Sequence, residues 1–245
     1  TILMRYLILS DIHANLEALK GIFDFIEKND IKYDRLVVLG DYVDYGPNPN
    51  EVIEFFKGKD GIFLLGNHDY ALINKGEREY FGEIALKCNL WTERKLKREN
   101  LEFLKTLSPK HKEENILFTH ASPLDPIWHY VHDFEDAREV FKISRERIIF
   151  VGHTHIPSFF AKVGDRIGGG YIFAGYAKIK LIEGGKYIIN PGAVGQPRDG
   201  IKTANFGLFD IKENTFEWFR IFVDFEETKR KILELGLPRG LLSYL

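Results

Sequence analysis

Five short apolar runs of this sequence each end in Asp, Asn or His, and this repeated arrangement constrains the fold more than any other feature. The runs cover residues 6–10, 36–40, 62–66, 116–119 and 148–152. Each has the length and the aliphatic or β-branched content of a buried strand, and amphipathic stretches lie between several of them. This alternation predicts an α/β fold in which helices flank a buried sheet.

Two segments outside these runs are predicted as flanking helices. Asn15 is a suitable N-cap for a helix that continues to about Lys28, because its side chain can accept a hydrogen bond from the first helical turn. Residues 226–235 are predicted as a closing helix. The length of 245 residues favours one elaborated domain over residues 1–245.

Two longer regions are predicted to elaborate this domain. Residues 70–114 have apolar residues at helical spacing and are predicted as a helical cap insertion. In residues 157–223, strand-like segments alternate with Gly-rich turns such as residues 168–170. We therefore expect a second, more antiparallel sheet in that part of the chain.

The polar residues that follow the five runs are of the types that bind metal ions. They are Asp11 and His13, then Asp41, then Asn67, His68 and Asp69, then His120, and last His153 and His155. We expect them to meet in space, because sites in open α/β sheets assemble beyond the carboxyl ends of the strands. Five of the eight His belong to this set, which makes coincidence a poor explanation.

The chemistry of these residues fits a centre of two divalent metal ions. Imidazole, carboxylate and amide oxygen suit Mn, Fe, Zn or Ni, and the absence of thiolate argues against a purely structural zinc. Seven positions with one bridging carboxylate provide eight bonds, which is four for each ion: Asp11, His13, Asp41, Asn67, His120, His153 and His155. A shared hydroxide in such a site is a nucleophile at neutral pH, so the sequence predicts hydrolysis.

The same segments resemble, in the same order, the motifs of the calcineurin-like metallophosphoesterase superfamily. They read Asp11-Ile12-His13, Gly40-Asp41-Tyr42-Val43-Asp44, Gly66-Asn67-His68-Asp69, His120 and Gly152-His153-Thr154-His155. Residues 190–199 are similar to a segment from a prokaryotic branch of predicted phosphodiesterases. The resemblance implies a sandwich of two mixed β-sheets flanked by helices.

The resemblance also implies a role for each residue of the set. Asp11, His13, Asp41 and His155 would hold one ion, and Asp41, Asn67, His120 and His153 the other. His68 would lie outside the metal ligands and would stabilise or protonate the leaving oxygen, with Asp69 orienting it. Asn67, His68 and Arg198 are the candidate contacts to substrate.

Two positions depart from the motifs of the superfamily. Its phosphoprotein phosphatases carry Arg after the Asp-x-Val-Asp segment, where this chain has Tyr45. This departure favours a phosphodiester or a small nucleotide-type phosphate ester over a phosphoprotein. Ala14 fills a place that Gly commonly holds, which a backbone with negative φ would tolerate.

The predicted function is therefore that of a two-metal-dependent phosphoesterase, a hydrolase of ester bonds and in particular a phosphodiesterase. The alternatives are a non-catalytic metal-binding interaction module on the same fold, and a nuclease. All seven ligand positions and His68 are present, which favours the enzyme over the module. The net charge of −2 offers no general attraction for nucleic acid, although it does not exclude a local cationic track.

Composition limits the setting in which the chain works. Its single cysteine, Cys88, cannot form an internal disulfide, which indicates a reducing compartment such as the cytoplasm. No apolar run approaches the roughly 18 residues that cross a bilayer, so no membrane partner is expected. The predicted partner is a small phosphate-ester substrate, and the sequence leaves open whether the chain forms a homo-oligomer.

Overall fold

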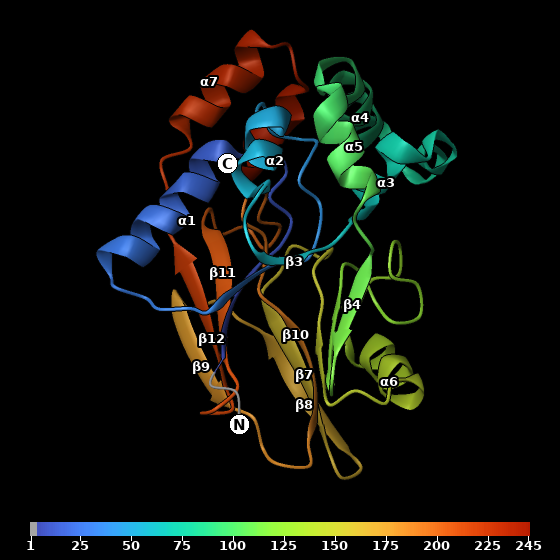
Figure 1. Cartoon of the computed structure of the whole chain (residues 1–245), viewed down its shortest axis with the longest axis vertical. Helices are drawn as coiled ribbons and strands as arrows, with labels where there is room; N and C mark the ends of the chain where they lie inside the picture. The colour runs from blue at the N-terminus through green and yellow to red at the C-terminus, as the bar shows by residue number, and fades with distance from the viewer. Residues whose placement is uncertain (1–3) are drawn as a thin grey trace.

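The computed structural model describes residues 4–245, and two mixed β-sheets stacked as a sandwich form its centre (Figure 1). The strands of the first sheet are β1 (Arg5–Leu9), β2 (Arg35–Val38), β3 (Gly61–Phe63), β9 (Tyr176–Lys180), β11 (Ala204–Asp210) and β12 (Thr215–Ile221). Those of the second are β4 (Lys110–Glu113), β5 (Ile116–Thr119), β6 (Ile148–Phe150), β7 (Ser158–Val163), β8 (Arg166–Tyr171) and β10 (Lys186–Asn190). The predicted α/β sandwich of two mixed sheets is confirmed.

The pairing of the later strands differs from the prediction. The first sheet has the order β3-β2-β1-β11-β12-β9 and the second β4-β5-β6-β10-β7-β8. Residues 157–223 therefore do not form a sheet of their own, because β9, β11 and β12 extend the first sheet and β7, β8 and β10 extend the second. β11 pairs with β1 and β10 pairs with β6, and this pairing satisfies backbone groups of β1 and β6 that would otherwise lack hydrogen-bond partners. Hydrophobic periodicity does not show which strands pair.

The predicted turn at residues 168–170 is also wrong, because these glycines lie inside β8. A Cβ atom at Gly169 would be only 2.1 Å from the carbonyl oxygen of Phe159 in β7. The backbone of Gly169 has φ +144°, which glycine adopts without a steric penalty. The glycines thus allow β8 to lie close against β7 instead of reversing the chain.

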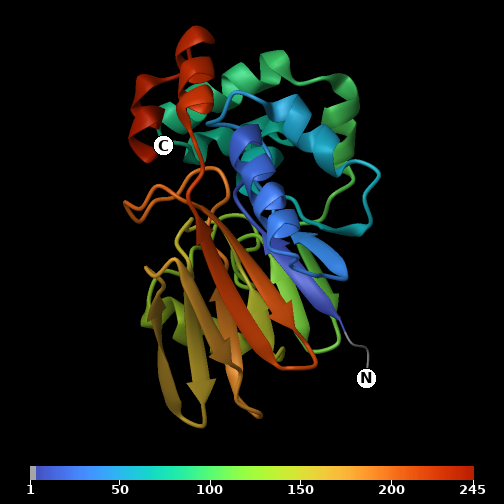
Figure 2. The same cartoon turned by 90° about the vertical axis from the view of Figure 1, so that its left-hand side faces the viewer.

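Helices cover the sandwich on its outer faces and at one end (Figure 2). They include α1 (Leu16–Lys28), α2 (Pro49–Phe56), α6 (Phe134–Ile143), α7 (Glu226–Glu234) and the 3₁₀ helix η2 (Arg239–Tyr244). The Asn15 side chain accepts a hydrogen bond from the backbone N–H of Ala18 at 3.1 Å, so the predicted N-cap of α1 is confirmed. The predicted closing helix is confirmed as α7. No helix within residues 4–245 is long and apolar enough to cross a membrane.

Four helical segments lie between β3 and β4 and correspond to the predicted cap. They are α3 (Asn67–Ile73), the 3₁₀ helix η1 (Lys75–Tyr80), α4 (Glu83–Lys95) and α5 (Arg98–Lys105). The helical prediction over residues 70–114 is wrong at its end, because residues 110–113 form β4, which pairs antiparallel with β5. Exposed and half-buried residues alternate along β4, as expected for an edge strand with one face toward solvent.

Aromatic side chains fill the space between the two sheets. Phe118 and Phe150 stack with ring centroids 5.3 Å apart, and Phe216 and Trp218 meet edge to face at 4.6 Å. The indole N–H of Trp218 donates to the carbonyl oxygen of Asn190 at 2.8 Å, so its one polar atom is also satisfied. This packed interior fixes the position of one sheet relative to the other. It thereby also fixes the positions of the loops at the strand ends.

Candidate metal centre

The loops after β1, β2, β3, β5 and β6 meet at one end of the sandwich, as the sequence predicted. They form two groups of buried Asp and His side chains, in each of which one donor atom per residue lies within 4.8 Å of the others. The groups are Asp11, His13, Asp41 and His155, and Asp41, His120 and His153. Asn67 joins the second group, because its Oδ1 is 3.0 Å from Nε2 of His120. All seven predicted ligand positions are thus brought together, and Asp41 belongs to both groups.

Each of the four His in these groups has one ring nitrogen against a backbone carbonyl oxygen. The pairs are His13 Nδ1 with Val43 at 2.8 Å, His120 Nδ1 with Leu39 at 3.0 Å, His155 Nδ1 with Gln196 at 2.6 Å, and His153 Nε2 with Trp128 at 3.3 Å. A carbonyl only accepts, so the nitrogen that faces it carries the proton and the other nitrogen of the neutral ring carries a lone pair. Such backbone contacts orient metal-binding imidazoles.

The lone pairs of His13 and His155 face each other. Nε2 of His13 and Nε2 of His155 are 3.1 Å apart, although each ring already donates through its Nδ1. Two neutral acceptors at this distance repel unless a cation or an additional proton lies between them. This donor set therefore fits a metal ion.

The carboxylate of Asp41 occupies the position shared by both groups. Its Oδ1 accepts the backbone N–H of His68 at 2.9 Å, whereas its Oδ2 is buried without a hydrogen-bond partner among the described residues. That Oδ2 lies 3.6 Å from Nε2 of His13 and 3.5 Å from Nε2 of His120. A buried carboxylate oxygen without a partner is costly, and a bound cation would remove that cost.

Burial shifts the pKa values of these groups toward their neutral forms. It raises the pKa of Asp11 to about 7, and together with the nearby charges of Asp69 and Asp11 it raises the pKa of Asp41 well above its usual value. Burial also lowers the pKa of His120 to about 3 and that of His155 well below its ordinary value. The imidazoles are therefore neutral near pH 7, which is the state that binds metal.

The backbone of these loops is strained. Eleven described residues other than glycine have positive φ, and eight of them lie in the site segments: Asp11, His13, Ala14, Asp41, Asp44, Tyr45, His153 and His155. The expectation of a negative φ at Ala14 is wrong, because its φ is +51°. Left-handed backbone at residues with a Cβ atom persists only where the surroundings enforce it, and such residues cluster at functional sites.

His68 lies beside the two groups, and its orienting partner differs from the prediction. Nδ1 of His68 is 2.8 Å from Oδ2 of Asp44, so Asp44 orients the ring. Asp69 instead accepts backbone N–H groups of Asp41 at 2.8 Å, Tyr42 at 3.0 Å and Gly66 at 3.0 Å. The prediction that Asp69 orients His68 is therefore wrong. Asp69 holds the loop that carries Asp41 against the start of α3.

Asn89, which the sequence did not single out, joins the cap to Asp44 and His68. The Asn89 side chain, fully buried in α4, donates through Nδ2 to Oδ2 of Asp44 at 2.8 Å and to the carbonyl oxygen of His68 at 3.1 Å. Its own Oδ1 accepts from Nε of Arg78 at 2.8 Å, and Arg78 pairs with Glu93 at 2.9 Å. An Asn within an amphipathic helix matches no motif, so no sequence signal could have singled it out.

Arg198 and Tyr45 lie together at the rim of the site. Nη2 of Arg198 is 3.5 Å from the Tyr45 hydroxyl, and its guanidinium carbon lies 5.8 Å from the centre of the Tyr45 ring. That ring is 4.7 Å from the rings of both His13 and His68. After burial, the charge of Arg198 is the next cause that lowers the pKa of His155. The predicted substrate contact Arg198 is thus close enough for its charge to act on the site.

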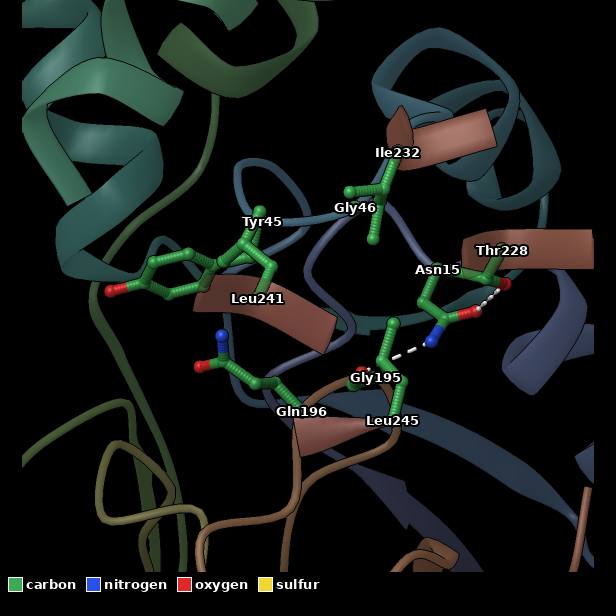
Figure 3. A pocket seen from close by; sticks show the side chains of 9 residues that line it. All are labelled: Asn15, Tyr45, Gly46, Gly195, Gln196, Thr228, Ile232, Leu241 and Leu245. Carbon is green, nitrogen blue, oxygen red and sulfur yellow. Dashed lines mark hydrogen bonds between the residues drawn. The ribbon is translucent and has the colours of Figure 1, made fainter. Parts of the chain in front are cut away.

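The C-terminal segment supports these loops from behind (Figure 3). Asn15 donates through Nδ2 to the carbonyl oxygen of Gly195 at 3.0 Å, and its Oδ1 accepts from the Thr228 hydroxyl at 3.0 Å. Leu241 and Leu245 pack beside them and leave a hollow of only about 10 Å³. The loop that carries Gln196 and Arg198 is thereby fixed against the loop that carries His13.

Two stacked mixed sheets with a buried cluster of Asp and His at their strand ends define the class of metallophosphoesterases. Residues 4–157 match the family model described as calcineurin-like phosphoesterase, and the chain belongs to this family of hydrolases that act on phosphate esters. The resemblance seen in the sequence is confirmed.

Three proteins illustrate what this chain is similar to. The crystal structure of a metallophosphoesterase from Sphaerobacter thermophilus has a TM-score of 0.85 at 32% identity, with 99% of this chain and 98% of that chain covered. An uncharacterized protein of Methanocaldococcus jannaschii is 40% identical over 241 residues, which is 96% of this chain and 94% of its own length. A symmetrical bis(5'-nucleosyl)-tetraphosphatase of Coxiella burnetii is 32% identical over 141 residues, covering 54% of this chain and 46% of the relative.

Proposed function

We propose that this protein is a two-metal-dependent phosphoesterase whose substrate is a phosphodiester or a small nucleotide-type phosphate ester. The observation that carries the proposal is the unpartnered Oδ2 of Asp41, which lies between the lone pairs of His13 and His120. A carboxylate oxygen in this position can be shared by two cations, and a shared carboxylate is typical of two-metal hydrolases.

The contacts of each residue suggest which atoms would hold each ion. Asp11, Asp41, His13 through Nε2 and His155 through Nε2 would hold one, and Asp41, Asn67, His120 through Nε2 and His153 through Nδ1 the other. Each assigned imidazole nitrogen is the one not engaged by a backbone carbonyl. Two divalent cations, when bound, neutralise phosphate oxygens and lower the pKa of water, and Mn, Fe, Zn and Ni all suit these ligands.

In this proposal His68 assists the leaving group. Its Nδ1–H would donate to Asp44, and only in the charged ring, which the Asp44 carboxylate stabilises, would Nε2 also carry a proton. That Nε2 proton would pass to the leaving oxygen as the bond of this oxygen to phosphorus breaks, and His68 would return to its neutral form. Burial lowers the pKa of His68, and Asp44 opposes that shift by stabilising the charged ring. His68 and Asn67 would contact the substrate, and Asp69 would act only by positioning the loop that carries Asp41.

The rim of the site supports a substrate of low charge. A phosphomonoester dianion carries one negative charge more than a diester, and here the position after Asp44 holds Tyr45 in place of a cation. Arg198 supplies one positive charge at the rim, beside that ring. The similarity to a bis(5'-nucleosyl)-tetraphosphatase supports a small nucleotide-type substrate on a separate ground, because a tetraphosphate carries several negative charges and the argument from low charge does not apply to it.

An activity screen after chelation tests the proposal. The chain is reconstituted with Mn, Ni, Zn, Mg or Fe, and its catalytic efficiency is measured on an aryl phosphodiester, an aryl phosphomonoester and a phosphopeptide. We expect hydrolysis only with added metal, two bound ions per chain and a preference for the diester. A preference for the phosphopeptide would contradict the substrate class. Bound metal without turnover on any ester would instead support a non-catalytic metal-binding module.

A further inference from the structure

A cavity of about 600 Å³ opens beside the metal centre, between the cap and the loop that follows β5. It is lined by Tyr70, Glu77, Tyr80, Asp125, Ile127 and Trp128. The cavity adjoins the site, because the carbonyl oxygen of Trp128 is 3.3 Å from Nε2 of His153. A second link runs through Phe81, which stacks on His68 at 4.6 Å and meets the Trp128 indole edge to face at 5.7 Å.

We propose that this cavity is the subsite for the nucleobase of the substrate, and that it prefers bases that carry an exocyclic amino group. The inference rests on the proposed function, since it assumes that the phosphate is held at the metal centre. It adds to that function a chemical class for the organic part of the ester.

The aromatic residues of the cavity are arranged to receive a planar ring. Tyr80 keeps 63% of its surface exposed, and its ring lies 5.2 Å from that of Trp128 at an angle of 51°. The Trp128 indole is held in place, because its N–H donates to Oε2 of Glu77 at 2.8 Å. An exposed tyrosine beside a fixed indole provides the stacking surface that proteins commonly use to bind single bases.

The charges of the residues that line the cavity determine which hydrogen-bonding groups of a base fit there. Glu77 and Asp125 both carry carboxylates, and the lining contains no cationic residue. Oδ1 of Asp125 accepts the backbone N–H groups of Ile127 at 2.9 Å and Trp128 at 3.2 Å, and no hydrogen bond within residues 4–245 uses its Oδ2. Both oxygens of Glu77 already accept hydrogen bonds, from Trp128 at 2.8 Å and from Asn74 at 3.3 Å, so the free acceptor of the lining is Oδ2 of Asp125. A free carboxylate oxygen favours an amino group, such as that of cytosine, adenine or guanine, and disfavours a carbonyl oxygen or a phosphate.

The distribution of charge thus orients the whole ligand. The phosphate is attracted to the metal centre and to Arg198, neither of which lines the cavity. The carboxylates that do line it repel a phosphate, and Oδ2 of Asp125 can accept a hydrogen bond from a base. The cavity therefore complements a nucleotide in one direction only.

Binding of cytidine and uridine 5′-monophosphate, measured by calorimetry on the full chain with and without chelator, tests this subsite. The two probes differ along one edge of the base: cytosine has an amino donor at position 4 and a lone pair at N3, where uracil has a carbonyl acceptor and an N–H donor. We expect the cytidine nucleotide to bind at least about tenfold more tightly, as the loss of one hydrogen bond to a charged group predicts. Equal affinities in the intact chain would overturn the proposal.

Substitutions at Tyr80 and Asp125 test which residue stacks on the base and which one causes the preference for cytidine. Tyr80→Ala should weaken both nucleotides about tenfold through loss of stacking. Asp125→Asn keeps an oxygen for the two backbone N–H groups but removes the charge, so it should abolish the difference between the probes. Phe222→Ala removes a side chain that is 86% exposed beyond β12, and as the matched control it should change neither affinity. Retention of the cytidine preference in Asp125→Asn would also overturn the proposal.

The outcomes separate this inference from the proposed function. A chain that hydrolyses the aryl phosphodiester but binds both nucleotides equally would refute the subsite alone. A chain that prefers the cytidine nucleotide yet hydrolyses no ester with any metal would refute the phosphoesterase function and leave the base subsite intact.

Discussion

The strand-end loops and the cap both reach the candidate metal centre, but they hold their polar groups in different ways. In the loops, imidazoles such as His13 and His120 are oriented by backbone carbonyl oxygens of the neighbouring loops. In the cap, Asn89 reaches Asp44 through contacts between side chains and is itself held by Arg78. The imidazoles of the loops are thus oriented by backbone groups that a side-chain substitution does not remove, whereas Asn89 orients Asp44 through an amide that one substitution removes. Substitutions in the two regions should accordingly differ in size and in kind.

The largest effect is expected in the loops, at Asp41. Asp41→Asn removes the charge of the carboxylate that both groups share, so both ions should bind more weakly and turnover of an aryl phosphodiester should fall below detection. Asp11→Asn should affect chiefly one ion, because Asp11 belongs to one group only. Elemental analysis of the reconstituted variants checks the expectation. Two tightly bound ions in Asp41→Asn would show that the carboxylate does not bridge.

The next effect is expected at His68, where the loops and the cap meet. His68→Ala should lower turnover by roughly 10² to 10⁴, the usual range for general acid catalysis, with metal content near two ions per chain. Rates and metal content are measured on the same preparations. His111→Ala, in the edge strand β4, is the matched control and should leave both unchanged. Loss of metal from His68→Ala would make this residue a ligand and the assigned role wrong.

The smallest effect is expected in the cap, at Asn89. Asn89→Ala removes the amide that holds Asp44 and the carbonyl of His68, so the ring should be less well oriented. We expect kcat to fall about tenfold, which corresponds to one hydrogen bond, with KM and metal content unchanged. Steady-state kinetics on the aryl phosphodiester, with metal analysis alongside, separate these quantities.

A second cap contact provides the control for Asn89. The side chain of Asn50 in α2 donates to the carbonyl oxygen of Lys95 at 2.9 Å and accepts the backbone N–H of Lys97 at 2.8 Å, without touching Asp44. Asn50→Ala should therefore loosen the base of the cap with little effect on kcat. An equal loss of kcat in both variants would mean that the cap acts through its general placement and not through Asn89.

The sequence predicted the positions of the candidate metal-binding residues, but it did not predict which side chain orients His68. The ligand positions were predictable because metal-binding residue types stand directly after apolar runs, and strand ends are a short-range property of the chain. The partner of His68 was not predictable, because Asp69 is its neighbour in sequence whereas Asp44 stands 24 positions before it, and only folding brings the Asp44 carboxylate to the ring. The residues at positive φ, such as Ala14, were equally hidden, since neighbouring loops enforce that conformation.

The sequence by itself determined the alternation of strands and helices, the strand-end positions of the Asp and His residues, and the chemistry that those residue types support. Each of these depends on periodicity, on residue type or on order along the chain, which local sequence encodes. The tertiary structure alone decided that β11 pairs with β1, that Asn89 from the cap reaches Asp44, and that Trp128 joins a cavity to the site. Those contacts join residues tens to hundreds of positions apart, and they form only where the packing of the sandwich and cap brings the side chains together.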